Sequence, residues 1–401
     1  MTETLPADAP ALDRFRAAVM ADTEVQQMLS ESFDPAEFSQ RATDWAEAQG
    51  ISLTDQDLIA IEGHDPLGIH MFGAAPQTGA VWPSRQWLPL RFAIEAGAID
   101  WCHFAGAPLS EPFFADTAAS VRTRPFNRLF RYRTSFDAFV DAPRSDTLPP
   151  DGFIFHMSRC GSTLVSQMLA ASPANIMVSE AEPLDTMVQL PLLGFGIALE
   201  HHVAALQAMV AALGRKRSGS SKRYFVKLDS WHTLALPLFR QAFPDTPWIF
   251  LYRDPVEVLV SQMRMRGQQT APGVLPPQLF GFAPGEEDLP DADYVARVLA
   301  KTCEAVIESW GTGGGMLVNY HELPDALFTR ILPHFGVAPD EQERDLMAAA
   351  AERDAKAPYQ PFTNDSEEKR READAPVRVA AERHFSDIYT RLEAIRVSSP
   401  R

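Results

Sequence analysis

Five short apolar runs, separated by residues that recur at helical spacing, mark the C-terminal part of the chain. Runs of this length predict strands that are covered on both faces. They are Phe153–Phe155, Ile176–Val178, Tyr224–Val226, Trp248–Tyr252 and Met316–Tyr320. Because strands and helices alternate, we expect an α/β fold over residues 149–400: a P-loop-type, doubly wound parallel sheet with helices on both faces.

Two smaller segments come before this region. Residues 8–62 predict a small all-α module, because apolar residues repeat at helical spacing and cap signals such as Asp34-Pro35 separate the repeats. Residues 64–148 predict a short α+β segment, with strands at Trp87–Glu95 and Ala98–Phe104. We assign no role to this middle segment.

Arginines and aromatic residues alternate late in the middle segment. We favour an amphipathic helix with a solvated face for them. The alternative is a cationic strip that helps to hold an anionic donor or a phenolic acceptor. The residues are Arg122, Arg124, Phe126, Arg128, Phe130, Arg131, Tyr132 and Arg133.

Composition narrows the class of protein. The 401 residues carry a formal net charge of −17, which argues against a nucleic-acid binder and means that an anionic ligand needs a local cationic site. Cys102, Cys160 and Cys303 show no metal spacing and no disulfide framework, so we expect a reducing compartment. The N-terminus lacks an apolar signal core and no run reaches transmembrane length, so a cytoplasmic location is expected.

The stretch from Gly152 to Ser172 reads as strand, turn and helix. In the turn, Ser158 to Gly161, a glycine allows close approach of a ligand, and the first N–H groups of the next helix favour an anion. A Walker loop would have lysine after its last glycine, whereas Ser162 and Thr163 follow Gly161 here and the cation is Arg159. An ordinary strand–helix turn with a surface arginine is the alternative.

A second strand–turn–helix runs from Thr246 to Arg266. Asp254 is a good N-cap, Pro255 suits the first helical position, and Glu257 predicts a capping box. Arg253 then lies at the carboxyl end of a strand, where open α/β sheets bind ligands, with Ser261 on the helix that follows. The alternative is a structural arginine that pairs with Asp254.

Together, Arg159-Cys160-Gly161-Ser162-Thr163-Leu164 and Arg253-Asp254-Pro255 with Ser261 resemble the two donor-binding motifs of sulfotransferases that use 3′-phosphoadenosine 5′-phosphosulfate (PAPS). The resemblance covers roughly the last 250 residues. It implies that Arg159, the amides of Gly161 to Thr163 and the hydroxyls of Ser162 and Thr163 hold the 5′-phosphate. Arg253 and Ser261 would hold the 3′-phosphate, and no metal is required. Ser158 and Cys160 depart from the usual proline and serine or glycine, and we expect Cys160 only to shape the turn.

The layout from Val226 to Asp254 resembles the bacterial and tyrosylprotein branch of that family. The resemblance implies that Lys227 assists the leaving group and that Glu182 is the base, with Glu180 a close rival that spacing does not separate. His232 is a weaker candidate. With Arg159 these residues would catalyse transfer of a sulfuryl group from PAPS, as co-substrate, to the hydroxyl of a peptide tyrosine, a phenol, a sugar or another alcohol.

Two alternatives for function stay open. A P-loop kinase or another nucleotide-dependent transferase is the first, and the missing Walker lysine disfavours it. The second is a non-catalytic binding protein that docks through residues 8–62. Those residues resemble the Nif-eleven-like leader domain of peptide precursors, which implies a peptide or protein partner; the alternative is a helical extension that packs on the next domain.

Two further stretches carry expectations. Residues 271–291 are rich in proline, glycine and acids, and predict either a lid or acceptor-binding loop, or a plain surface insertion. Thr363 to Arg371 is read as an exposed mixed-charge loop. The alternative is a basic loop that closes over the donor, with Lys369, Arg370 or Arg371 as contacts.

Overall fold

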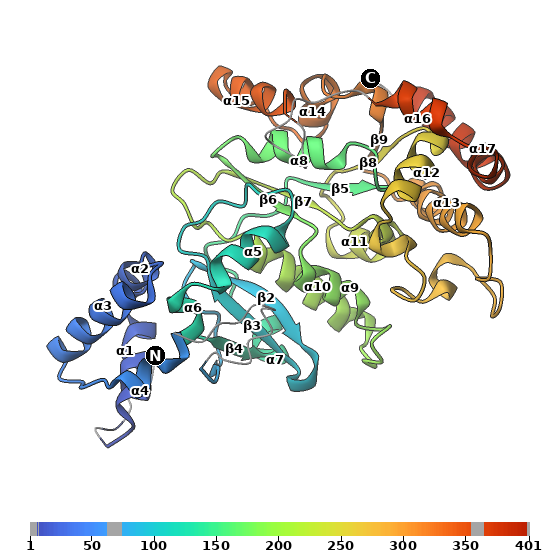
Figure 1. The fold of residues 1–401 in the computed structure, drawn as a ribbon. Coiled ribbons are helices and arrows are strands. Elements are labelled where there is room, and N and C mark those ends of the chain that lie inside the picture. Colours follow the sequence, from blue (N-terminus) through green and yellow to red (C-terminus); the bar gives the residue numbers. More distant parts are fainter. Residues whose placement is uncertain (1–5, 7, 62–73, 354–364, 399–401) are drawn as a thin grey trace. The chain divides into compact units, whose positions relative to one another are not determined.

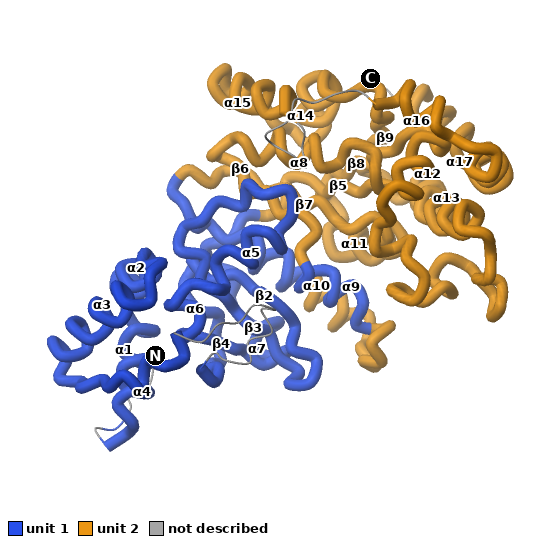
Figure 2. Tube along the Cα trace, in the orientation of Figure 1, with its two compact units in different colours: residues 1–148, 182–190, 207–219 blue, residues 149–181, 191–206, 220–401 orange. Residues whose placement is uncertain are grey.

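The computed structural model describes residue 6 and residues 8–61, 74–353 and 365–398. They form two compact units (Figure 2), each described below by itself. The first unit comprises residues 1–148, 182–190 and 207–219, and the second comprises residues 149–181, 191–206 and 220–401. No helix among the described residues is both long enough and apolar enough to cross a membrane.

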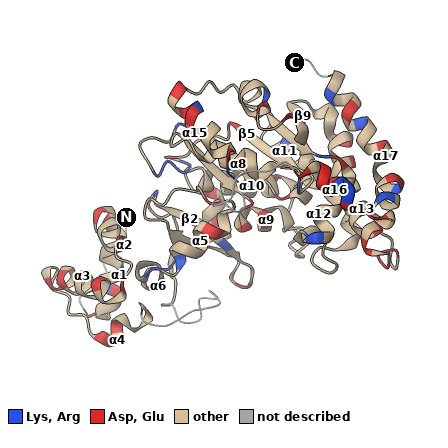
Figure 3. Ribbon diagram, turned by 45° about the horizontal axis from the view of Figure 1, so that its top comes forward, with Lys and Arg blue, Asp and Glu red and all other residues tan. Residues whose placement is uncertain are grey.

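The first unit begins with the predicted helices. They are α1 (Ala11–Ala21), α2 (Thr23–Ser30), α3 (Pro35–Ala48) and α4 (Asp55–Leu58). The side chains of Asp22 and Asp34 accept hydrogen bonds from the first N–H groups of α2 and α3, which explains where these helices begin. Acidic side chains are frequent along these helices (Figure 3).

A four-stranded sheet forms the rest of this unit, in the order β1-β4-β3-β2. Its strands are β1 (Gln77–Gly79), β2 (Trp87–Ala93), β3 (Ala98–His103) and β4 (Tyr132–Ser135), and α5 (Phe114–Arg122), α6 (Pro125–Leu129) and α7 (Phe136–Asp141) surround them. The α+β character and both predicted strands are confirmed. The single amphipathic helix expected around Arg122–Arg133 is wrong, because Pro125 starts a new short helix and Arg133 lies on β4, paired with Asp100 at 2.6 Å.

The helices and this sheet share one core. Phe15 of α1 lies 5.6 Å from Phe130 between ring centroids, and both side chains are buried. Gln26 of α2 is also buried and accepts a hydrogen bond from Trp87 Nε1 at 3.0 Å. The boundaries predicted at 8–62, 64–148 and 149–400 remain predictions.

The second unit contains the five predicted strands in one parallel sheet, in the order β6-β7-β5-β8-β9. They are β5 (Gly152–His156), β6 (Asn175–Ser179), β7 (Arg223–Lys227), β8 (Trp248–Tyr252) and β9 (Gly315–Asn319). Figure 1 shows α8 (Ser162–Ala170) on one face of this sheet and α11 (Leu236–Ala242) on the other. The predicted α/β fold class with a doubly wound parallel sheet is therefore confirmed. Because all five strands run the same way, the ends of β5, β6, β7 and β8 meet at one edge of the sheet.

Eight further helices are described in the rest of the chain, of which α9 and the second half of α10 belong to the first unit. They are α9 (Glu182–Gln189), α10 (Leu199–Leu213), α12 (Pro255–Arg264), α13 (Asp291–Ser309), α14 (Leu332–His334), α15 (Glu341–Ala351), α16 (Ser366–Glu372) and α17 (Ala375–Ser398). A 3₁₀ segment, Ser230–Ala235, precedes α11. The α-helix starts at Leu236, where Pro237 can occupy the first turn. Residues 271–291 include a 3₁₀ turn at Pro277–Phe280.

The exposed loop expected from Thr363 to Arg371 is wrong for its described part. Thr363 and Asn364 lie outside the described residues, and Ser366–Glu372 is helical. Lys369 on this helix is buried, with its ammonium 2.6 Å from the carboxylate of Asp365. The mixed charges therefore pair at helical spacing and with the neighbouring helix, which the loop interpretation did not anticipate.

Candidate functional site

The turn between β5 and α8 has an unusual backbone. Ser158, Arg159 and Gly161 have φ angles of 74°, 53° and 85°, so three of its four residues are left-handed. A Cβ on Gly161 would lie 2.7 Å from Leu323 Cδ1 and 2.9 Å from Tyr320 Cδ2, so this position needs glycine for space as well as for φ. Left-handed non-glycine residues at a strand end are a sign of a functional turn.

Polar contacts hold the turn in this shape. The N–H of Ser158 donates to His156 Nδ1 at 3.0 Å, and its hydroxyl accepts from Gln262 Nε2 at 3.1 Å. Gln262 is fully buried on α12 and also accepts from the N–H of Gly267 at 2.7 Å. The turn is thus tied to the helix that follows β8, a contact that the sequence did not indicate.

The helix after the turn begins at Ser162, and both Ser162 and Thr163 are buried in its first turn. The first N–H groups of a helix have no intrahelical acceptor, and the helix dipole adds positive potential there. The predicted anion cradle therefore has suitable geometry: a glycine with no room for a side chain, followed directly by a helix N-terminus.

Cys160 is buried under the turn. Its Sγ donates to the carbonyl of Leu251 at 3.1 Å, and burial raises the pKa of the thiol to about 12. A protonated, enclosed thiol is a poor nucleophile, which agrees with a role in shaping the turn.

Arg159 extends away from the turn toward the end of α12. Its Nη2 donates to the carbonyl of Met265 at 2.7 Å. Burial lowers the pKa of Arg159, and the carboxylate of Glu180 partly opposes that effect. Even so, a guanidinium stays charged at neutral pH, so Arg159 is a cation available beside the turn.

Lys227 and Glu180 form a buried pair at the ends of adjacent strands. Lys227 is the last residue of β7 and is 1% exposed. Its Nζ lies 2.7 Å from Glu180 Oε1 and 3.5 Å from the Thr163 hydroxyl, so it joins the end of β6 to the first turn of α8. Glu180 has a φ of 50°, which ends β6, and its N–H donates to the carbonyl of Lys227 at 2.8 Å.

His156 completes this group. Its Nδ1 accepts from Ser158, so the neutral ring carries its proton on Nε2, which lies 2.8 Å from the carbonyl of Leu228 and 3.3 Å from Glu180 Oε1. Burial lowers the pKa of His156, which favours the neutral ring. Burial also raises the pKa of Glu180, but Lys227 and His156 outweigh it, so that the pKa lies well below its ordinary value and Glu180 is ionised.

Glu182 has a different environment. It begins α9, which belongs to the first unit, and burial raises its pKa while Arg91 partly opposes that shift. His232, the weaker candidate, is buried with its Nε2 3.9 Å from Asp229 Oδ2.

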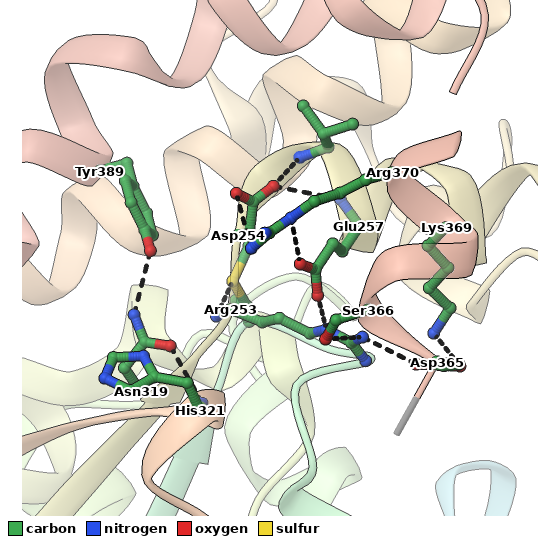
Figure 4. Close-up of polar contacts among 12 residues, drawn as sticks. Arg253, Asp254, Glu257, Asn319, His321, Asp365, Ser366, Lys369, Arg370 and Tyr389 are labelled. Atoms are coloured by element: carbon green, nitrogen blue, oxygen red, sulfur yellow. Dashed lines mark hydrogen bonds and ion pairs between the residues drawn. The ribbon is translucent and has the colours of Figure 1, made fainter. Parts of the chain in front are cut away.

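Arg253 directly follows β8 and lies inside a cluster of charges (Figure 4). Its guanidinium carbon lies 3.9 Å from the centre of the Tyr320 ring, and its Nε donates to Glu257 at 2.6 Å. Nη2 donates to Asp365 at 2.7 Å and to the Ser366 hydroxyl at 3.1 Å. Burial alone would lower the pKa of Arg253, yet hydrogen bonds to these carboxylates raise it overall.

The N-cap role of Asp254 is confirmed, since its side chain accepts from the N–H groups of Val256 and Glu257. The capping box is wrong, because both carboxylate oxygens of Glu257 face arginines, Arg253 and Arg370. The four-residue spacing between Arg253 and Glu257 could have indicated this pair. Ser261 lies two turns into α12, with no hydrogen bond to Arg253 among the described residues.

The structure places Thr163, Glu180 and Lys227 beside the turn that contains Arg159 and the buried Cys160. Sequence reasoning missed His156, Gln262 and Asp365. A histidine that ends an apolar strand was the available signal for the first of these.

Residues 150–275 match the model of the sulfotransferase family. This stretch contains both strand–turn–helix motifs, and its match supports the sulfotransferase resemblance there. The bacterial and tyrosylprotein branch and the leader-like module remain predictions. None of the curated proteins matches the chain.

Several solved structures are similar to the chain. The sulfotransferase domain from the curacin biosynthetic pathway is 15% identical, with a TM-score of 0.37 over 64% of this chain and 100% of that chain. The sulfotransferase domain from the Synechococcus PCC 7002 olefin synthase is 16% identical, with a TM-score of 0.35 over 64% and 98%. A Mycobacterium tuberculosis H37Rv sulfotransferase is 15% identical, with a TM-score of 0.35 over 60% and 77%.

Proposed function

We propose that the protein transfers the sulfuryl group of PAPS to a hydroxyl of an acceptor. The observation that carries this proposal is the convergence of Lys227, Glu180 and Thr163 beside the turn at 158–161, within the stretch that matches the sulfotransferase family. The turn and the N-terminus of α8 would bind the 5′-phosphosulfate, while Arg253 and Ser261 would bind the 3′-phosphate. Arg159, Lys227 and Arg253 would supply the positive charge that faces the donor, so the scheme invokes no metal.

The reaction is an in-line displacement at sulfur. The acceptor oxygen forms a bond to sulfur as the bond from sulfur to the bridging phosphate oxygen breaks. Lys227 would stabilise the charge that develops on that leaving oxygen, because its ammonium lies beside Thr163 in the first turn of α8. The products are the sulfated acceptor and adenosine 3′,5′-bisphosphate.

The acceptor proton must pass to a base, and we propose Glu180 for this role, with Glu182 as the alternative. Glu180 is paired with Lys227, which makes it a weak base in that state. If the ammonium moves toward the leaving oxygen during transfer, Glu180 loses its counterion and its pKa rises as the proton arrives. Glu180→Gln should therefore abolish most turnover, whereas Glu182→Gln should retain it.

The test of the proposed function is calorimetry of the full chain with adenosine 3′,5′-bisphosphate and with ATP. Tight binding of the bisphosphate is expected, and binding of ATP without the bisphosphate would refute the proposal in favour of a nucleotide-dependent kinase-like enzyme. Arg253→Ala should weaken binding of the bisphosphate about tenfold or more, with little effect on adenosine 5′-phosphate. Equal losses for the two ligands would contradict the 3′-phosphate assignment.

We also propose that residues 8–62 dock a peptide or protein partner that delivers the acceptor. What supports this is two exposed apolar side chains in this segment: Phe33, between α2 and α3, is 67% exposed, and Ile59, after α4, is 53% exposed. Docking raises the effective concentration of the acceptor and adds no contact at the reacting atoms. Ile59→Ser should thus raise KM for a docked peptide acceptor but leave kcat and the kinetics of a small phenol unchanged; an equal change for the phenol would refute docking.

A further inference from the structure

A carboxylate that the proposed reaction does not use lies inside the charge cluster of Figure 4. Glu257 on α12 is 2% exposed, its Oε2 accepts from Arg253 Nε at 2.6 Å, and its Oε1 lies 2.8 Å from Arg370 Nε. A buried carboxylate is unfavourable unless it is paired and hydrogen-bonded, and two arginines do this here. Because Glu257 holds Nε, the orientation of the Arg253 guanidinium is restricted.

A second carboxylate accepts from the Nη2 of the same guanidinium. Asp365 Oδ1 accepts from Arg253 Nη2 at 2.7 Å, while its Oδ2 lies 2.6 Å from Lys369 Nζ. The Ser366 hydroxyl also accepts from Nη2 at 3.1 Å. Burial raises the pKa of Asp365, but the hydrogen bonds from Lys369 and Arg253 lower it by more. The pKa therefore lies below its ordinary value, and this carboxylate is ionised. A phosphate that accepts from Nη2 would compete with Asp365 for this donor.

A phosphate that accepts from Nε or Nη2 of Arg253 competes with these carboxylates, and burial indicates which one is displaced. The side chain of Asp365 is 33% exposed, so on release it keeps Lys369 and gains water. Release of Glu257 would leave a buried carboxylate with Arg370 as its remaining cation, which is unfavourable. Glu257 is also only four residues from Arg253 in the chain, in the first turn of α12, which keeps the two side chains close.

We propose that Arg253 is held between a permanent carboxylate, Glu257, and an exchangeable one, Asp365, which occupies the place of the 3′-phosphate until a ligand displaces it. This inference rests on the proposed function. Glu257 is a positioning residue that acts through Arg253. Asp365 is an internal competitor that weakens binding of donor and of bisphosphate product alike, and so helps the product to leave after each turnover.

The test is calorimetry of full-chain variants with adenosine 3′,5′-bisphosphate and, as the ligand that lacks the 3′-phosphate, adenosine 5′-phosphate. Asp365→Asn should tighten binding of the bisphosphate about threefold, and Glu257→Gln should weaken it about tenfold. Neither change should alter binding of adenosine 5′-phosphate. Glu368→Gln is the matched control, because Glu368 lies on α16, the helix that Asp365 precedes, but pairs with Arg264 at 2.9 Å; this variant should change neither affinity.

The opposite signs of the two variants separate this proposal from a merely structural role. If Asp365→Asn binds the bisphosphate no more tightly than Glu368→Gln does, Asp365 is no competitor and the proposal is overturned. If Glu257→Gln binds as the unsubstituted protein does, the positioning role is wrong. Should Glu257→Gln fail to fold, the comparison of the Asp365 and Glu368 variants still decides. Failure of the proposed function itself is visible earlier, as a parent protein that does not prefer the bisphosphate.

Discussion

Replacement of Lys227 by methionine isolates the chemical role of its ammonium. The side chain is buried, so methionine keeps most of the packing and removes the group that lies 2.7 Å from Glu180 Oε1 and 3.5 Å from Thr163 Oγ1. Loss of one preorganised charge aimed at a leaving group costs about 3–4 kcal/mol, or roughly a factor of 10² to 10³ in kcat. Because this interaction grows in the transition state, the Kd for adenosine 3′,5′-bisphosphate should change less than about threefold.

The same substitution has a predictable effect on stability. Loss of one partner of a buried ion pair costs about 3–5 kcal/mol. The side chain of Glu180 is 22% exposed, so solvent screens part of this, and we expect about 2 kcal/mol at pH 7. Lys227 depresses the folded-state pKa of Glu180, so the pair stabilises the fold above the unfolded-state pKa of about 4.3 and is lost as the pH falls through the folded-state value. The stability gap between the two proteins should therefore narrow below about pH 4.

Three assays measure these effects. Steady-state sulfation of a small phenol gives kcat, calorimetry gives the Kd for the bisphosphate, and urea unfolding at several pH values gives the stability. The exposed Lys222, just before the same strand, provides the control variant Lys222→Met, which should behave as the parent protein does. A kcat for Lys227→Met within a few-fold of the parent would remove Lys227 from the mechanism. A loss of bisphosphate affinity as large as the loss of kcat would show ordinary binding instead of transition-state stabilisation.

Three further predictions concern the turn and the N-terminal helices. Cys160→Ser should keep activity, and the buried thiol with its pKa of about 12 should resist alkylation at neutral pH; a large loss of activity would show a chemical role. Ser158→Pro should lose bisphosphate binding, because proline cannot adopt a φ of 74° and lacks the N–H that donates to His156, whereas Ser158→Gly should bind; normal binding by the proline variant would contradict this turn geometry. A chain that starts at Asp65 should melt at a clearly lower temperature, because it exposes Phe130 and Trp87; an unchanged Tm would show that the helices are independent.

Local sequence patterns determined most of the secondary-structure elements of the second unit. The five strands of the parallel sheet, the turn before α8 and the N-cap at Asp254 could all be predicted, because each depends on residues a few positions apart. The same locality explains the errors. The spacing of the arginines at 122–133 predicts one helix, but Pro125 starts a second helix and the pairing of β4 with β3 places Arg133 on a strand.

Tertiary structure decided which charged groups meet. Glu180 and Glu182 are equivalent in sequence, but the left-handed φ of Glu180 at the end of β6 directs its carboxylate to Lys227, while Glu182 begins α9. Asp365 reaches Arg253 across 112 residues of chain, and no spacing rule predicts a pair at that separation. Periodicity and capping act within one or two turns, so they determined the elements; the pairing of buried charges depends on how strands order and helices pack, so only the folded chain decided it.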